Sequence, residues 1–373
     1  MKSIKEVKDL KGKKVLLRLD LNVPVRDGKI LNDFRIKKVI PTIGFLQERG
    51  AKVIILSHIG RKKEDTLKPV FDYLVGEVKN IKFNGDVLDE SAFELVGKMK
   101  EGEVILMENL RKHEEEKEGD DSFSKQISKL GDIYVNESFS NSHRDHSSIT
   151  GIPKFLPSYS GILFQKEIDG LSSCFEPQEP SLFILGGNKL KTKLSFVEHS
   201  LEIGSFVFVG GALANDFFKE KKFEIGKSFV CEEKFNLGSL LENKKLILPI
   251  DVVVRNSGGE IITKKPENVL SDEKILDAGP QTISLLEDKL KEVKFVLMNG
   301  PLGDYEKGFG KPTNDLIQAI AGSGIQSIIG GGDTTALINE LGIEGKFTFV
   351  STGGGAMLEF LQNKTLPGIE ALG

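Results

Sequence analysis

Short apolar runs alternate with helical stretches along most of this 373-residue chain. The runs are rich in valine, isoleucine, leucine and phenylalanine, which predicts strands at 14–20, 51–57, 104–109, 132–137, 181–187, 205–211, 245–254, 294–300, 327–332 and 347–355. Helical periodicity is seen between several of them, at 34–49, 123–130, 194–201, 282–293 and 334–341. Strand–helix alternation at this spacing predicts an α/β fold with mostly parallel sheets that helices cover on both faces.

The chain is longer than one hydrophobic core usually supports, which predicts two domains. A stretch near 151–180 combines prolines and small residues with one short helical pattern, and it separates two groups of predicted strands. We therefore expect an N-terminal domain at 1–158, a connecting helix within 159–178 and a C-terminal domain at 179–355.

Charge and composition exclude several classes of protein. The net charge of -4 argues against a surface that wraps nucleic acid. Cys174 and Cys231 are far apart and form no CxxC pair, as expected of reduced thiols. The N-terminal residues lack the apolar core of a signal peptide, and no run approaches the roughly 18 apolar residues of a membrane helix. We expect a cytoplasmic protein with neither a nucleic-acid nor a membrane partner.

Seven of the eight arginines precede residue 145, although the chain otherwise favours lysine. A guanidinium group grips a carboxylate or phosphate through two parallel hydrogen bonds, which lysine cannot do. Most candidate residues follow predicted strands, where parallel sheets bind ligands: Arg18, Asp20, Asn22, His58, Arg61, Arg111 and Arg144. Arg35 lies at the start of a predicted helix, where backbone N–H groups also attract anions. The set predicts a pocket for a small, multiply charged anion, although a salt-bridged strand end and a structural histidine would give the same local patterns.

Glycine clusters end four predicted strands of the second half, at 186–187, 210–211, 330–332 and 353–355. A strand, a glycine turn and a helix start together form a phosphate cradle, because bare N–H groups can approach the anion. In GGGDTTALI, Asp333 is a candidate Mg²⁺ ligand and Thr334 a candidate phosphate donor, although both could simply cap a helix.

Two further segments of the second half carry candidate charges. Lys189 and Lys193 are one helical turn apart, and two ammonium groups at a helix start oppose the helix dipole, which favours a functional role. Asn299 ends a predicted strand, and Glu306 follows as a candidate ribose ligand or a solvent-facing side chain. The phosphate-loop motif G-x-x-x-x-G-K-[ST] is absent, and G-x-G-x-x-G is absent too, which argues against a dinucleotide-dependent dehydrogenase.

In order along the chain, LLRLDLNVPV, NDFRIKKVIPTI, ILSHIGR, ENLRKHEEE, DIYVNESFSNSHRDHSS, LGGNKLKTKL, MNGPLGDYE, IIGGGDTTALI and VSTGGGAMLEFL resemble the phosphoglycerate kinase family, from residue 3 to residue 373. The resemblance implies two doubly wound parallel-sheet, Rossmann-like domains joined by an interdomain helix and hinge. It also implies that the tail 356–373 packs on the first domain and that the protein is a monomer.

The resemblance further implies reversible, Mg²⁺-dependent phosphoryl transfer between 1,3-bisphosphoglycerate and ADP, giving 3-phosphoglycerate and ATP. An inactive nucleotide- or metabolite-binding protein of the same fold is the alternative. The implied phosphoglycerate site comprises Arg18, Asp20, Asn22, Arg35, His58, Arg61, Arg111 and Arg144. The implied nucleotide site comprises Lys189, Lys193, Gly211, Asn299, Glu306, Gly331, Gly332, Asp333, Thr334, Gly353, Gly354 and Gly355, with Asp333 as the metal ligand. The implied catalytic residues are Arg35, Lys189 and Lys193.

The chain departs from the common family pattern at a few positions. Met298 stands where tryptophan is frequent, Glu137 begins an altered ESFSNS segment, and Asn188 and Thr192 alter the GGAKVSDK motif. None of these departures removes a charge-bearing group of the implied sites.

Overall fold

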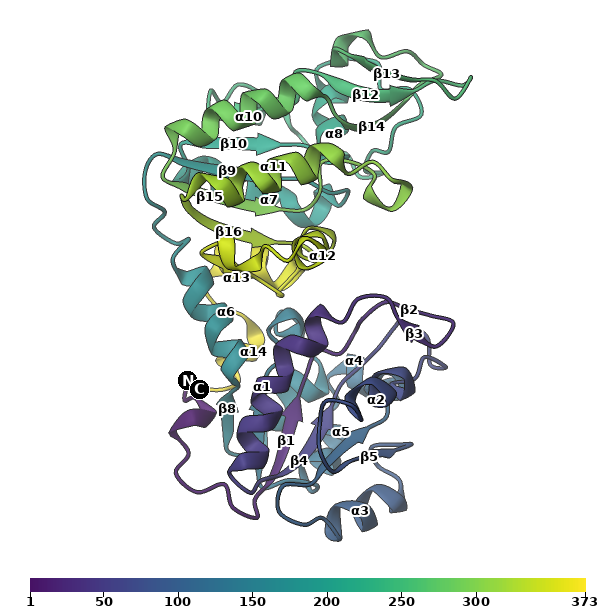
Figure 1. Ribbon diagram of the computed structural model, residues 1–373, viewed down its shortest axis with the longest axis vertical. Coiled ribbons are helices and arrows are strands. Elements are labelled where there is room, and N and C mark those ends of the chain that lie inside the picture. The colour runs from purple at the N-terminus through teal and green to yellow at the C-terminus, as the bar shows by residue number, and fades with distance from the viewer. The chain divides into compact units, whose positions relative to one another are not determined.

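The computed structural model describes residues 1–373, apart from the side chain of Glu306. The chain forms two compact units, one comprising Met1–Asp169 and Thr365–Gly373 and the other Gly170–Lys364. Each unit contains a six-stranded sheet with flanking helices (Figure 1). Residues 356–364, which we expected in the returning tail, belong to the second unit, and the segment grouped with the first unit begins at Thr365.

The sheet of the first unit has the strand order β5-β6-β4-β1-β7-β8, and all of its strand pairs are parallel. Its strands are β1 (Lys14–Arg18), β4 (Lys52–Leu56), β5 (Ile81–Asn84), β6 (Val104–Met107), β7 (Ile133–Asn136) and β8 (Ser158–Ser160). A small hairpin pairs β2 (Val25–Arg26) with β3 (Lys29–Ile30). The order reverses beside β1, since the chain first adds β4 on one side and later β7 on the other. Ligands of open α/β sheets bind outside the carboxyl ends of strands at such a point.

The helices of the first unit are α1 (Phe34–Glu48), α2 (Lys68–Leu74), α3 (Glu90–Gly97), α4 (Glu115–Glu118), α5 (Asp121–Ser128) and α14 (Pro367–Glu370). Helix α6 (Ile162–Ser172) runs across the sequence boundary between the two units. Apolar side chains of α1 and α2 form one buried core with β1 and β4. This core fixes where the strands end, and it thereby positions the polar residues that follow them.

The main sheet of the second unit has the order β11-β10-β9-β15-β16-β17, again all parallel. Its strands are β9 (Ser181–Leu185), β10 (Phe206–Val209), β11 (Leu246–Ile247), β15 (Phe295–Asn299), β16 (Gln326–Gly330) and β17 (Phe349–Val350). Its helices are α7 (Leu190–Ile203), α8 (Leu213–Glu220), α9 (Gly238–Leu241), α10 (Pro280–Glu292), α11 (Lys311–Ser323), α12 (Gly332–Leu341) and α13 (Gly355–Asn363). A separate antiparallel sheet joins β12 (Val252–Arg255), β13 (Ile261–Lys264) and β14 (Lys274–Ala278).

The prediction of a mainly parallel α/β fold is confirmed, but one predicted strand is wrong. The run 245–254 is not continuous, because β11 ends at Ile247 and β12 begins at Val252 in a different sheet. Pro249 lies between them, and proline cannot donate the ladder hydrogen bond that a central strand needs. The predicted strand 347–355 shortens to Phe349–Val350 because its glycines form the turn before α13. Among the described residues, no helix is both long and apolar enough to cross a membrane.

Candidate functional site

A cluster of basic side chains lies at the carboxyl edge of the first unit's sheet. Arg18 is the last residue of β1, and His58 follows β4. Arg111 and Arg144 come after β6 and β7, which pair with β4 and β1 respectively. Four separate strand ends therefore contribute to one basic cluster.

Arg18 and His58 form the buried part of the cluster. Arg18 has no exposed surface, and its Nη2 lies 3.1 Å from His58 Nδ1. Burial and the neighbouring Arg18 hold the pKa of His58 well below its ordinary value, so the imidazole is neutral. Because arginine can only donate, Nδ1 accepts this hydrogen bond and the proton of His58 is on Nε2. The neutral ring therefore keeps one N–H donor for a ligand.

Asp20 and Asn22 fix the approach of Arg35 from α1. Arg35 Nη1 donates to Asp20 Oδ2 at 2.7 Å and to the backbone oxygen of Asn22 at 3.3 Å. Ser140 donates a hydroxyl hydrogen bond to the same carboxylate oxygen of Asp20. Although burial opposes ionisation, Arg35 and these hydrogen bonds lower the pKa of Asp20 to about 2. About a quarter of the Arg35 side chain is exposed, so the guanidinium is oriented and still accessible to a ligand.

The remaining arginines complete the basic cluster, and His143 lies beside one of them. Arg111 donates to the backbone oxygen of Gly60, and burial together with Arg144 and Arg18 lowers its pKa. Arg144 Nε lies 3.2 Å from His143 Nε2. Arg61 is exposed, and its backbone N–H donates to Asp65 at 2.8 Å. Mutual repulsion among these cations is relieved by a bound anion, which fits the predicted anion pocket.

In the second unit, glycine turns from four strand ends meet backbone to backbone. Gly187, Gly211, Gly300 and Gly331 have φ values of 94°, 61°, 91° and 101°, which favour glycine. A side chain at Gly211 would place Cβ 2.8 Å from Gly187 N, and one at Gly331 would place it 2.9 Å from Gly300 N. Side chains are therefore excluded, and the turns present bare backbone as a phosphate cradle requires.

Lys193 extends from α7 into these turns. Its Nζ donates to the backbone oxygen of Gly186 and, at 3.0 Å, to Asn299 Oδ1. Burial and the nearby Lys189 lower the pKa of Lys193 to about 8, against the opposing effect of Asp333. Lys189 itself precedes α7 and is exposed, so the two lysines do not share one environment.

Asp333 and Thr334 lie in the first turn of α12, and Gly331 occupies the cap position, so neither residue is the N-cap. Asp333 is exposed, whereas Thr334 Oγ1 is buried and has no hydrogen-bond partner among the described residues. Gly354 and Gly355 begin α13, which reaches the same region through the 3.6 Å contact between Met357 Sδ and Asn299 Nδ2. Glu306 was also a candidate, but its side chain lies outside the described residues.

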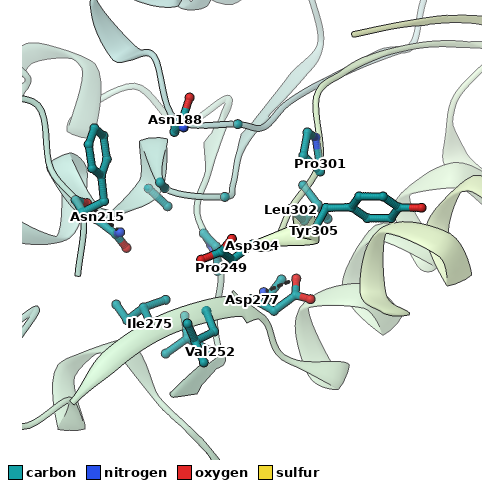
Figure 2. A pocket seen from close by; sticks show the side chains of 18 of the residues that line it. Asn188, Asn215, Pro249, Val252, Ile275, Asp277, Pro301, Leu302, Asp304 and Tyr305 are labelled. Carbon is teal, nitrogen blue, oxygen red and sulfur yellow. Dashed lines mark hydrogen bonds between the residues drawn. The ribbon is translucent and has the colours of Figure 1, made fainter. Parts of the chain in front are cut away.

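A cavity of about 310 Å³ adjoins the glycine turns. Figure 2 shows Val252, Ile275 and Asp277 of the three-stranded sheet along one side, and Pro301 and Tyr305 on another. Further lining residues from the turns and nearby helices include Gly187, Gly211, Asn215, Phe218, Phe229 and Asp333. This volume is at the lower end of small-ligand pockets, and a cavity with both polar and apolar walls beside a phosphate cradle is suited to a nucleoside.

The comparisons with known proteins agree with this geometry. The family model described as phosphoglycerate kinase matches residues 4–364. The chain belongs to the phosphoglycerate kinase family. A phosphoglycerate kinase from Clostridium kluyveri is 41% identical over 391 residues, which covers 100% of this chain and 98% of the relative.

Two solved phosphoglycerate kinase structures resemble the chain over nearly its whole length. The enzyme from Pyrococcus horikoshii has a TM-score of 0.87 and 32% identity, and it covers 100% of this chain and 98% of its own. The enzyme from Coxiella burnetii has a TM-score of 0.79 and 34% identity, with coverages of 99% and 98%. The prediction of two Rossmann-like domains of a phosphoglycerate kinase is confirmed at this level.

Two histidines near Arg144, His143 and His146, were not predicted from the sequence of this phosphoglycerate kinase family member. His143 and His146 flank Arg144 closely, and burial and the nearby arginines lower the pKa of each to about 4. Both rings are therefore neutral, and His143 Nδ1 is buried without a hydrogen-bond partner among the described residues. The HRDH pattern around Arg144 was the available signal, because histidines beside a candidate anion-binding arginine can supply N–H donors.

The cavity was not predicted from the sequence either, nor was the raised pKa of the Asp277 carboxyl group that lines it. Asp277 is 5% exposed, and burial raises its pKa to about 7 even though Ala278 N donates to it at 2.9 Å. The folded protein therefore keeps this proton up to about pH 7, whereas an unfolded chain releases it near pH 4. The folded state binds more protons in this window, so the free energy of unfolding falls as the pH rises from about 4 to about 7.

Asp277→Asn should remove this pH-dependent cost. At each pH, the free energy of unfolding of the variant is compared with that of the unsubstituted protein. We expect this difference to favour the variant more at pH 8 than at pH 5, by up to roughly 1.4 kcal/mol for each unit of pKa shift that falls within the interval. Urea unfolding at both pH values measures the difference, with Asp288→Asn as an exposed control. An Asp277→Asn effect that is the same at pH 5 and pH 8 would contradict the raised pKa.

Proposed function

We propose that this chain catalyses the reversible, Mg²⁺-dependent transfer of a phosphoryl group between 1,3-bisphosphoglycerate and ADP, giving 3-phosphoglycerate and ATP. The observation that carries the proposal is a pair of complementary anion sites within one phosphoglycerate kinase family member. One site consists of guanidinium groups at strand ends, and the other consists of bare glycine turns around the half-buried side chain of Lys193. We further propose a cytoplasmic monomer that binds neither nucleic acid nor membranes.

We assign the phosphoglycerate to the first unit. Arg61, Arg111 and Arg144, with the Nε2–H of His58, would hold the phosphate that is not transferred, because guanidinium groups bind phosphate oxygens through paired hydrogen bonds. Arg18 would form the base of this site, and Asp20 and Asn22 would contact the hydroxyl and carboxyl end of the substrate. Arg35 would contact the phosphoryl group in transfer.

We assign the nucleotide to the second unit, with its base and ribose in the cavity. The turns at Gly211, Gly331, Gly332 and Gly353–Gly355 would surround its phosphates, with Thr334 Oγ1 as a nearby donor. Lys189 and Lys193 would stabilise negative charge on the transferred group, and Asn299 would hold Lys193 through its side-chain oxygen at 3.0 Å. Glu306 remains a proposed ribose ligand. Residues 159–178, which include α6, remain the proposed connection between the two functional domains.

The carboxylate oxygens of Asp333 are suited to bind Mg²⁺ that arrives with the nucleotide. Its exposed carboxylate lies in the first turn of α12 and lines the cavity. The described residues contain no group of three or more His, Cys, Asp or Glu that could hold a metal ion by themselves. Mg²⁺ is commonly bound by one or two carboxylates together with substrate phosphates, so Asp333 would be its protein ligand. When bound, the ion neutralises phosphate charge.

The reaction needs alignment and charge rather than a protein nucleophile. A terminal oxygen of ADP, which is already ionised, attacks phosphorus, and the bond from phosphorus to the carboxyl oxygen breaks with its electron pair left on the carboxylate. Arg35, Lys189 and Lys193 would stabilise the charge on the group in transfer. Because the proposed ligand sites belong to different units, a hinge movement would bring the ligands together and exclude water from the acyl phosphate.

A steady-state assay with 3-phosphoglycerate and MgATP tests the proposal. Acyl phosphate formation is followed through a coupled reductive step, and ADP formation is followed in parallel. We expect both products in equal amounts, and only when both substrates are present. Absence of turnover despite binding of both substrates, measured by calorimetry, would instead indicate an inactive binding protein of this fold.

A further inference from the structure

A buried hydrogen-bond chain lies behind Arg18. Arg18 Nε donates to Ser148 Oγ at 2.7 Å, and Ser148 Oγ donates to Glu116 Oε1 at 2.6 Å. The other carboxylate oxygen, Oε2, accepts from Ser148 N at 2.9 Å. Arg18 and Ser148 have no exposed surface, and Glu116 is 1% exposed. The three residues come from β1, from the helical turn Ser147–Gly151 and from α4. These hydrogen bonds therefore form a relay that joins three separate segments.

The hydrogen-bond donors and acceptors of this relay can be arranged in one way. Arginine can only donate, so Ser148 Oγ accepts from Arg18 Nε. The hydroxyl then has one hydrogen, which is directed to Glu116. A second contact fixes the backbone of Ser148, because Tyr134 Oη donates to its carbonyl oxygen. Ser148 is therefore held at its N–H, its carbonyl and its hydroxyl, and it offers Arg18 an acceptor at a defined position.

The burial of Glu116 requires compensation. Burial raises the pKa of Glu116, while Arg18, the hydrogen bonds from Ser148 and Arg111 lower it. His146 Nδ1 lies 3.9 Å from Oε1, and burial with the neighbouring cations keeps this histidine neutral. A carboxyl group in such a place costs stability unless its hydrogen bonds are made. Both of its oxygens accept hydrogen bonds from Ser148, the residue whose hydroxyl accepts from Arg18. This arrangement indicates a role in holding Arg18 as well as in packing.

We propose that Glu116 is a positioning residue for the phosphoglycerate site and acts on Arg18 through Ser148. The relay holds the Nε edge of Arg18, which leaves Nη2 to donate to His58 and fixes the base of the basic cluster. The inference rests on the proposed function, since Arg18 and His58 matter for catalysis only if phosphoglycerate binds there. Glu116 and Ser148 themselves need not contact the substrate.

Glu116→Gln tests the relay with almost no change in volume. The side-chain amide presents N–H donors where the carboxylate accepted, so it competes with Arg18 for the lone pair of Ser148. We expect the KM for 3-phosphoglycerate to rise about tenfold, equivalent to about 1.4 kcal/mol, while the KM for MgATP stays within about twofold. Ser148→Ala should raise the same KM. Glu118→Gln makes the same chemical change at an exposed position of α4 and should leave both constants unaltered. An unchanged KM for 3-phosphoglycerate in Glu116→Gln would overturn the inference.

Non-additivity separates positioning from a general loss of structure. In an Arg18→Lys background, which lacks the Nε edge, adding Glu116→Gln should raise the KM for 3-phosphoglycerate little further. Effects that multiply would show that Glu116 acts independently of Arg18 and would contradict the relay.

A spectroscopic measurement tests the relay without turnover. The Nε–H proton of Arg18, assigned by its absence in Arg18→Lys, should exchange slowly with solvent in the ligand-free protein. It should exchange at least about tenfold faster in both variants, because Ser148→Ala removes the acceptor Oγ and the amide of Glu116→Gln competes with Arg18 for it. Unaltered exchange in both variants would refute the relay even if the enzyme is active. A protein that fails the turnover assay but shows these exchange rates would refute the proposed function and leave the relay intact.

Discussion

With alanine in place of Arg35, we expect kcat for phosphoryl transfer from MgATP to 3-phosphoglycerate to fall about a thousandfold, the scale of a transition-state arginine. The reason is geometric as well as electrostatic. Asp20 holds one terminal nitrogen of Arg35 at 2.7 Å, while about a quarter of the side chain stays exposed. An already oriented guanidinium loses little entropy when charge develops on the transferred group, and alanine removes that stabilisation entirely.

Steady-state kinetics with each substrate varied in turn measures this effect. The KM for MgATP should change little, because Arg35 lies in the unit that we assign to phosphoglycerate. Arg26→Ala removes a guanidinium from the exposed hairpin β2–β3 and should leave kcat within about twofold. If Arg35→Ala retains kcat within about threefold, Arg35 does not contact the transferring group.

Lys193→Ala is expected to lower kcat at least about tenfold, or about 1.4 kcal/mol of barrier. Lys193 Nζ lies among the glycine turns, 3.0 Å from Asn299 Oδ1, and places a half-buried positive charge there. Lys191→Ala is the matched control, because Lys191 lies on the same helix but is exposed and paired with Glu233. Thermal unfolding of both variants separates a loss of catalysis from a loss of fold. Turnover unchanged in Lys193→Ala would remove Lys193 from the catalytic set.

The lowered pKa of Lys193 adds a pH signature to this prediction. Its charged form is lost as the pH rises through about 8 in the free enzyme. The value of kcat/KM for MgATP should therefore fall above about pH 8 in the unsubstituted enzyme, since this quantity reports groups of the free enzyme. The corresponding limb should be absent from the profile of Lys193→Ala. An identical alkaline limb in both proteins would assign the titration to another group.

The sequence was sufficient to predict the parallel sheets and most of the charged groups. Fully apolar runs such as those of β4 and β9 have few alternatives to a strand buried on both faces. Arg35 and Lys193 were recognisable because basic side chains at the start of a predicted helix oppose the helix dipole, which favours a functional role. The break between β11 and β12 was less evident, because the apolar residues on both sides of Pro249 suggested one continuous strand.

The cavity and the buried polar groups could not be predicted in the same way. Val252 and Ile275 line a ligand-sized space, yet in the sequence they are indistinguishable from core residues. The altered pKa values of His146 and Asp277 result from burial by segments distant in the sequence, which periodicity does not reveal. Glu116 lies in the charged run 113–121, whose other side chains are exposed or half-buried, and the fold buries this one side chain and directs it to Ser148.

Incorporation of labelled ADP into ATP, measured with MgATP present and without 3-phosphoglycerate, tests direct transfer between the two substrates. If alignment and charge alone catalyse the reaction, no phosphorylated enzyme forms, and labelled ADP should not be converted to ATP until 3-phosphoglycerate is added. The exchange should then appear, and it should be weakened in Arg35→Ala and Lys193→Ala. Rapid exchange in the complete absence of 3-phosphoglycerate would reveal a protein group that accepts the phosphoryl group and would contradict direct transfer.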